Sequence, residues 1–145
     1  MIKPLTTWRC DVCGHQIDGI ESGYVIWKTD SNFSMNSIKI IHQKKCDLRD
    51  HSSSAALIDF LGEKGLANLL CKLSLGPIKK SQGQKPVCQV VDMDEFVDFF
   101  RRVQSPFYEE ARTKFGSPEL RQDFDDANEL YPYLPEVLKE IAAKY

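Results

Sequence analysis

The sequence predicts an α+β protein in which an N-terminal β-hairpin, held by a metal site, packs against a mostly helical C-terminal region. Three observations predict this fold. Cysteine and histidine form two closely spaced pairs, separated by two β-rich runs, within the first 50 residues. Apolar residues recur at helical spacing in the second half of the chain. The length of 145 residues suits one integrated domain, with residues 1–50 as the hairpin module and residues 51–145 as the helical region.

The hairpin module is expected to begin with a tight turn. The segment Cys10-Asp11-Val12-Cys13-Gly14 places two thiols on one turn, and Gly14 supplies the positive φ that such turns often require. Residues 23–28 and 37–42 are rich in Val, Ile, Tyr and Trp, which predicts two strands. The sequence Asp-Ser-Asn at residues 30–32 predicts the turn that joins them.

Short helices are expected to make up most of the remaining chain. Residues 55–61 predict a helix that stops near Gly62, and four leucines at helical spacing predict a second one over residues 66–73. The clearest helix starts at Met93, with Phe96, Phe99, Phe100 and Val103 as one apolar stripe. Residues 87–91 predict a third strand that extends the small sheet.

Prolines mark the helices expected near the C-terminus. Pro106 and Pro118 each occupy a favoured first helical position, and the helix at Pro118 is expected to be acidic and to continue to Leu130. Residues 131–135 predict an extended linker, and the last helix starts at Pro135.

The order Cys10-x2-Cys13-x28-His42-x3-Cys46 predicts a site for one zinc ion. Two thiolates on a single turn can hold one tetrahedral ion, and the hairpin between the pairs returns two further ligands to it. Four protein ligands leave no position for water or substrate, so this zinc would be structural. His51 is an alternative to His42 as the fourth ligand. A redox role for Cys10 and Cys13 would need a strand before the pair and a long helix after it, which the sequence does not predict.

This arrangement resembles the treble-clef and zinc-ribbon group of zinc-binding modules, in which a ligand-bearing turn, a hairpin and a second ligand pair precede a helix. The resemblance covers residues 8–61 and implies Zn²⁺ as the cofactor. The chain also resembles small bacterial proteins with such a site near the N-terminus, and that resemblance implies no particular function.

The cysteine count and hydropathy indicate the compartment. Five cysteines, two of them in a Cys-x-x-Cys pair, are a poor framework for disulfides and suit a reducing environment. Cys71 and Cys88, which lie outside the ligand pattern, are expected to be buried, because free cysteine behaves as a small hydrophobe. No apolar run approaches the roughly 20 residues that span a bilayer. We therefore expect a cytoplasmic protein with no membrane partner.

The residues favour a non-catalytic protein that acts as an interaction adaptor or regulator. The sequence contains none of the motifs of zinc proteases, zinc deaminases or serine hydrolases. A nuclease of the His-Asn-His type, with His42 as the base, is the least favoured alternative. Aromatic residues in the C-terminal half exceed what one helix needs, and aromatics are common interface anchors. We therefore predict a protein partner, and we expect Tyr108 to be one of the exposed aromatic contacts.

Nucleic-acid binding by the N-terminal half is the main alternative. Basic residues flank the second ligand pair, and two tryptophans could stack on bases; the candidates are Lys39, Lys44, Lys45, Arg49, Trp8 and Trp27. The whole chain, however, has a net charge of −2 and an isoelectric point near 5.9. Dedicated nucleic-acid binders are typically basic, so the composition favours a protein partner.

Overall fold

The computed structural model describes residues 5–79 and 88–145, and the chain divides into two compact units. Residues 7–104 form the N-terminal unit, and residues 105–145, with Leu5 and Thr6, belong to the C-terminal unit. This division differs from the expected one at residue 50, because one strand and two helices beyond that point belong to the N-terminal unit. Within the described ranges, no helix is long and apolar enough to cross a membrane.

A three-stranded antiparallel sheet forms the centre of the N-terminal unit. Its strands are β3 (Gly23–Thr29), β4 (Met35–His42) and β5 (Ser53–Ala56), in the order β4-β3-β5. The Asp30 carboxylate accepts hydrogen bonds from the backbone amides of Asn32 and Ser34, both at 2.9 Å, and so shapes the turn between β3 and β4. The two predicted strands and their connecting turn are confirmed.

A second, two-stranded sheet carries the first ligand pair. Strands β1 (Thr7–Arg9) and β2 (Gln16–Asp18) are antiparallel, and Trp8 lies opposite Ile17. Both side chains are buried, at 1% and 0% exposure. The Cys10–Cys13 turn joins these strands, which the residue pattern did not predict because each has only three residues.

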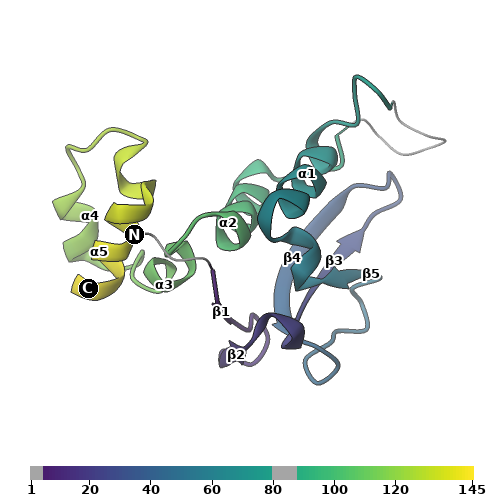
Figure 1. Ribbon diagram of the computed structural model, residues 1–145, viewed down its shortest axis with the longest axis horizontal. Coiled ribbons are helices and arrows are strands. Elements are labelled where there is room, and N and C mark those ends of the chain that lie inside the picture. Colours follow the sequence, from purple (N-terminus) through teal and green to yellow (C-terminus); the bar gives the residue numbers. More distant parts are fainter. Residues whose placement is uncertain (1–4, 80–87) are drawn as a thin grey trace. The chain divides into compact units, whose positions relative to one another are not determined.

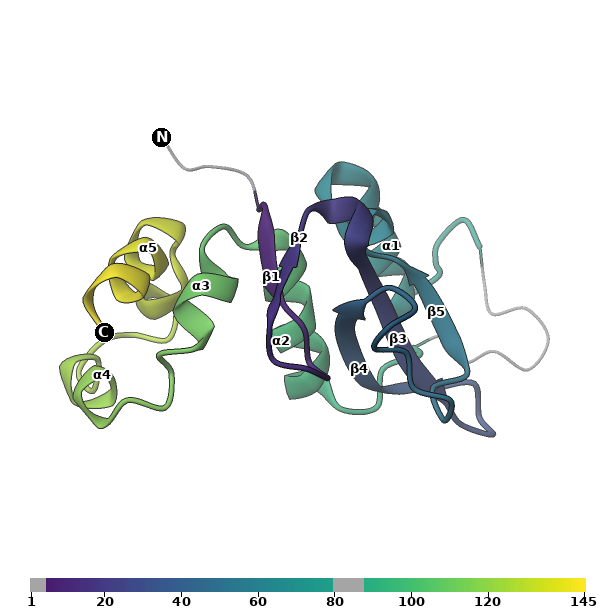
Figure 2. The same ribbon diagram turned by 90° about the horizontal axis from the view of Figure 1, so that it is seen from below.

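Two helices, α1 (Gly62–Leu73) and α2 (Met93–Gln104), lie over one face of the three-stranded sheet (Figures 1 and 2). Aromatic rings fill the space beneath them. Phe60 packs edge-on against Phe99, with ring centroids 5.2 Å apart, and against Trp27 at 6.3 Å. The predicted α2 stripe is confirmed, because Phe96, Phe99 and Val103 are buried.

The helix predicted at residues 55–61 is wrong. Its first residues belong to β5, and Leu57–Phe60 form one turn of 3-10 helix. Pairing with the edge of β3 satisfies the backbone groups of β5, and this non-local gain overrides the helix propensity of Ala55 and Ala56. Gly62 starts α1 instead of ending a helix.

The predicted apolar stripe of α1 is only partly correct. Leu69 is fully buried, whereas Leu66 and Leu70 are 40% and 51% exposed. The first turn of α1 packs tightly on the preceding 3-10 turn at Gly65, where a Cβ atom would lie 2.0 Å from the carbonyl carbon of Phe60. A residue with a side chain therefore cannot occupy this position without moving the backbone.

The third strand predicted at residues 87–91 is reduced to one bridge. Val90 pairs in parallel with Met35, and Val87 lies outside the described residues. The expected burial of Cys71 and Cys88 is also wrong, since both cysteines are exposed. Cys71 lies on the solvent side of α1, because that helix turns Leu69 toward the core.

The C-terminal unit has its own small core. Its elements are α3 (Tyr108–Arg112), α4 (Pro118–Asp123), a 3-10 turn (Tyr131–Tyr133) and α5 (Pro135–Lys144). The buried residues are Tyr108, Ala111, Leu120, Val137, Leu138 and Ile141. Helix α4 begins at Pro118, as the sequence predicts, and the Ser117 hydroxyl caps it by accepting a hydrogen bond from the Leu120 amide at 3.3 Å. The start of α5 at Pro135 is likewise confirmed.

Several predictions for this unit need correction. The helix near Pro106 starts at Tyr108, because Phe107 before it adopts a left-handed conformation with φ of 68°. Helix α4 ends at Asp123 instead of Leu130, and the expected extended linker is a 3-10 turn. Tyr108 is 4% exposed, so it is a core residue and not a surface contact.

Candidate metal centre

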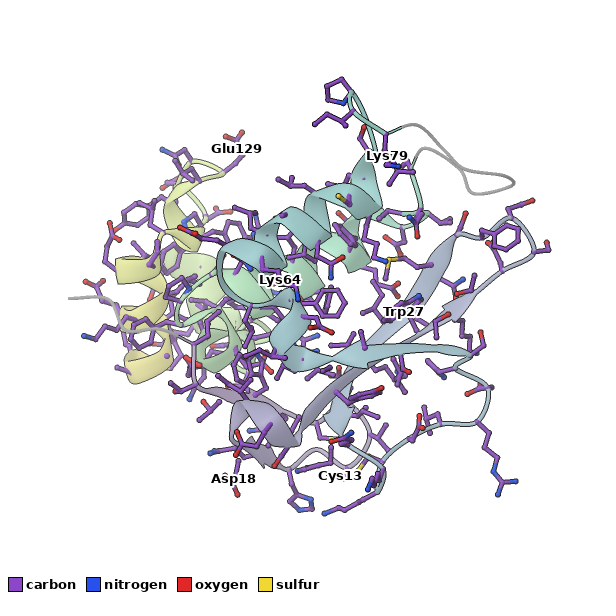
Figure 3. The ribbon with its side chains drawn as sticks, turned by 45° about the vertical axis from the view of Figure 1, so that its right-hand side comes forward. Cys13, Asp18, Trp27, Lys64, Lys79 and Glu129 are labelled. Atoms are coloured by element: carbon purple, nitrogen blue, oxygen red, sulfur yellow. The ribbon has the colours of Figure 1, made fainter. Side chains whose placement is uncertain are left out.

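Four ligand-type side chains converge from two turns. Cys10 and Cys13 lie in the turn between β1 and β2, His42 ends β4, and Cys46 follows in the next turn. The Gly14 amide donates to the Cys10 carbonyl at 3.0 Å, and Gly14 has the expected positive φ, 77°. Figure 3 shows Cys13 at the lower edge of the unit, with the strands between it and Lys64 of α1.

The ligand atoms of these four residues all lie within 4.8 Å of one another. Nδ1 of His42 is 3.4 Å from Sγ of Cys13 and 3.7 Å from Sγ of Cys46. Zinc–sulfur bonds of about 2.3 Å in a tetrahedral shell place two sulfurs roughly 3.8 Å apart. The cluster is therefore compatible with one metal ion.

The orientation of His42 favours metal binding. Its Nε2 lies 3.1 Å from the carbonyl oxygen of Gln16. A carbonyl can only accept a hydrogen bond, so Nε2 carries the proton and the lone pair remains on Nδ1. Nδ1 is the atom that faces the thiols, which is the arrangement that a metal-bound histidine adopts.

The thiols of Cys10 and Cys46 differ in acidity. Burial alone raises the pKa of Cys10, but hydrogen bonds from the backbone amides of Cys13, Val12 and His42 outweigh it and lower the pKa to about 6. Burial, followed by the neighbouring Cys10 and Cys13, raises the pKa of Cys46 to about 11. Without metal, the site at neutral pH therefore combines a thiolate at Cys10 with a protonated thiol at Cys46, whose proton a metal ion would displace.

His51, the alternative ligand, does not join the cluster. It is 8% exposed, and its Nδ1 lies 2.8 Å from the Asp50 carboxylate. Asp50 also pairs with Lys28 at 3.1 Å. These contacts hold His51 in the loop before β5, away from the four ligand atoms.

The predicted nucleic-acid residues fall into three groups by exposure. Lys44, Lys45 and Arg49 are exposed next to the second ligand pair, and Lys39 and Trp27 are partly buried. The ammonium of Lys72 lies over the Trp27 ring, 5.4 Å from its centroid. Trp8 cannot stack on a base, because it is 1% exposed and its indole N–H donates to the backbone carbonyl of Arg102 at 2.9 Å.

Two charged residues next to the ligands were not predicted from the sequence. Arg102 is buried, and its guanidinium donates to the Asp11 carboxylate at 2.6 Å. The pair is separated by 91 positions in the sequence, so spacing could not reveal it. The available signal was the position of Arg102 on α2, three residues after Phe99 and therefore next to it on the helix surface.

Comparison of the chain with protein-family models, with curated proteins and with solved structures found no match.

Proposed function

We propose that Cys10, Cys13, His42 and Cys46 bind one structural zinc ion, and that the chain is a non-catalytic protein stabilised by this ion. The convergence of the four ligand atoms, with Nδ1 of His42 facing the thiols, carries this proposal. Three thiolates and one imidazole are a typical zinc shell. Cys10 and Cys46 are 1% and 5% exposed, which suits a closed site.

The element after the second ligand pair narrows the resemblance to zinc-binding modules. This element is a strand, β5, instead of the helix that a treble clef has at this place. One ligand pair lies in the turn of the β1–β2 hairpin, and the other spans the end of strand β4 of the β3–β4 hairpin and the turn after it, which favours the zinc-ribbon arrangement.

A catalytic role for His42 is disfavoured by the same contacts. Nε2 is bound to the Gln16 carbonyl and Nδ1 faces the thiols of Cys13 and Cys46. Neither ring nitrogen is left to take a proton from water, which a nuclease base must do.

Native mass spectrometry with and without a strong chelator tests the zinc proposal. We expect one zinc per wild-type chain, and its loss in Cys13→Ser and His42→Gln. Cys71→Ser is the matched control for the cysteine change, and His51→Gln for the histidine change, because neither residue belongs to the cluster. A wild-type chain that folds without metal would contradict the proposal. So would loss of zinc in His51→Gln while His42→Gln keeps it.

We further propose that the C-terminal unit binds a protein partner. Two adjoining hollows of about 290 and 310 Å³ share Phe124 and Ile141. Tyr133 lines the first and Tyr131 the second, and they are 37% and 46% exposed. Aromatic side chains in surface hollows are common anchors of interfaces. Tyr131 and Tyr133 therefore replace the buried Tyr108 as the candidate contacts with a partner.

The charge of the C-terminal unit indicates the chemistry of this partner. Residues 105–145 contain 9 Asp/Glu and 5 Lys/Arg, a net charge of −4. A partner segment with an apolar side chain between basic residues would complement such a surface.

Fluorescence anisotropy with labelled synthetic peptides tests the partner proposal. The probes are peptides with a central Leu or Phe between lysines, and the same peptides with glutamate in place of lysine. We expect only the basic peptides to bind, and Tyr133→Ala to weaken binding at least tenfold. Phe33→Ala, which removes a 38% exposed aromatic from the N-terminal unit, is the control and should have no effect. Equal binding by wild type and Tyr133→Ala would exclude this surface.

Nucleic-acid binding remains the second candidate function, and the exposure of Lys44, Lys45 and Arg49 beside Cys46 favours it. Binding of this kind weakens steeply with salt, because it releases counterions. Replacing Lys44 and Lys45 with Glu should abolish binding of a short oligonucleotide while leaving the zinc content at one per chain. Unchanged binding would exclude this role for the two lysines.

The cytoplasmic location expected from the sequence stays a prediction.

A further inference from the structure

We infer that Asp11 and Arg102 form a positioning pair, which holds the Cys10–Cys13 turn in the shape that binds metal and so couples metal binding to the packing of α2. This inference rests on the proposed zinc site. Neither residue is a ligand, and α2 contributes no side chain to the metal cluster.

Arg102 reaches the ligand-bearing turn with both halves of its guanidinium. Nη1 donates to Oδ2 of Asp11 at 2.6 Å, and Nη2 donates to the backbone carbonyl of Arg9 at 2.9 Å. Arg9 and Asp11 are the two neighbours of Cys10 in the chain. Their bonds to one rigid, planar group fix the backbone on both sides of this cysteine.

Asp11 passes this restraint to the strand that carries His42. The same oxygen, Oδ2, accepts a hydrogen bond from the Ile40 amide at 2.7 Å. The Asp11 amide in turn donates to the Ile40 carbonyl at 2.8 Å. Ile40 lies two residues before His42, so Asp11 sets the distance between the two ligand pairs.

The pair is largely shielded from solvent, which makes its geometry costly to disturb. The side chain of Arg102 is 3% exposed and that of Asp11 is 20% exposed. Breaking a buried ion pair by removing one partner leaves an uncompensated charge, whereas a complete, hydrogen-bonded pair holds one arrangement. Trp8 supports the helix end of the link by donating to the Arg102 carbonyl.

The experiment must separate positioning of the ligands from general stability. The test variants are Asp11→Asn, which keeps an acceptor for the Ile40 amide but removes the charge, and Arg102→Gln. Val103→Ala is the matched control, because it removes buried volume from the same turn of α2 and changes neither a metal ligand nor a member of the ion pair. Each chain is loaded with Zn²⁺ to measure release to excess chelator, and with Co²⁺ to record its ligand-field spectrum.

We expect Asp11→Asn and Arg102→Gln to bind one zinc and to release it about 10–100-fold faster than wild type, which corresponds to the loss of metal affinity typical when residues that orient ligands are replaced. Their Co²⁺ spectra should shift, whereas Val103→Ala should lower Tm and leave the spectrum unchanged. If Arg102→Gln does not fold, Asp11→Asn alone decides the question. If Asp11→Asn and Arg102→Gln gave the same zinc release rates and Co²⁺ spectra as Val103→Ala, the inference would be overturned. A wild-type chain that binds no zinc would instead overturn the proposed site itself.

Discussion

At the scale of single residues, the two ring nitrogens of His42 have different partners. The Gln16 carbonyl holds Nε2, which leaves Nδ1 facing the thiols of Cys13 and Cys46. The spacing of the cysteines and His42 was sufficient to predict which residues cluster. It could not predict which nitrogen faces the thiols, because that depends on a carbonyl 26 positions away in the sequence.

The pKa values of the cysteines predict a pH-dependent metal affinity. Zinc binds thiolates, so it must displace the proton of Cys46, whose pKa is raised to about 11 in the absence of metal. Cys10, with a pKa of about 6, contributes a second proton only as the pH falls to that value. Zinc affinity should therefore rise at least about tenfold for each pH unit between 6 and 8. Competition titrations with a chromophoric chelator measure this slope, and an affinity that does not change with pH would contradict it.

At the scale of elements, the sequence predicted those that depend on local pattern but not those that depend on tertiary pairing. Strands β3 and β4 and helices α2 and α5 follow from propensity and periodicity within their own residues, and all four were predicted. Strand β5 could not be predicted in this way, because Ser53–Ala56 is extended only through its pairing with β3. The three-residue strands β1 and β2 also depend on each other and on the turn between them.

The close contact between α1 and the turn before it predicts that a side chain at Gly65 lowers the free energy of unfolding. In Gly65→Ala the new Cβ would lie 2.0 Å from backbone atoms of Phe60, so the helix start must shift. We expect a loss of about 1–3 kcal/mol in the free energy of unfolding, as for other overpacked sites.

Gly116→Ala is the control for this prediction. A Cβ at Gly116 meets no atom within 4 Å, so its effect should stay within about 0.5 kcal/mol. Thermal or urea unfolding followed by circular dichroism compares the two variants with wild type. Equal stability of Gly65→Ala and wild type would mean that the contact relaxes without cost.

At the scale of the whole molecule, the metal centre belongs to one of two compact units. The ligand-bearing turns, the three-stranded sheet and α2 all lie within residues 7–104. The C-terminal unit has a separate core around Leu138 and Ile141. The sequence predicted the order of β and helical elements but not this boundary, because Arg102 and Trp8 connect the two ends of the N-terminal unit through contacts that no local pattern encodes.

Metal removal should therefore affect the two units unequally. With chelator present, amide hydrogen exchange should accelerate in β1, β2, β4 and α2, since zinc supplies folding free energy to the unit that contains it. Amides of α5 should exchange at unchanged rates. Hydrogen exchange detected by mass spectrometry, with peptides that separate residues 93–104 from residues 135–144, makes this comparison. Equal acceleration in both helices would show that the units unfold together.

The position of the tryptophans has a practical consequence. The chain contains two, Trp8 and Trp27, and both lie in the N-terminal unit, whereas the C-terminal unit contains no tryptophan. Intrinsic tryptophan emission is therefore a reporter confined to the unit that holds the metal centre. An unfolding curve recorded by this emission, compared with one recorded by far-ultraviolet dichroism, reveals whether the molecule melts in one cooperative step or in two.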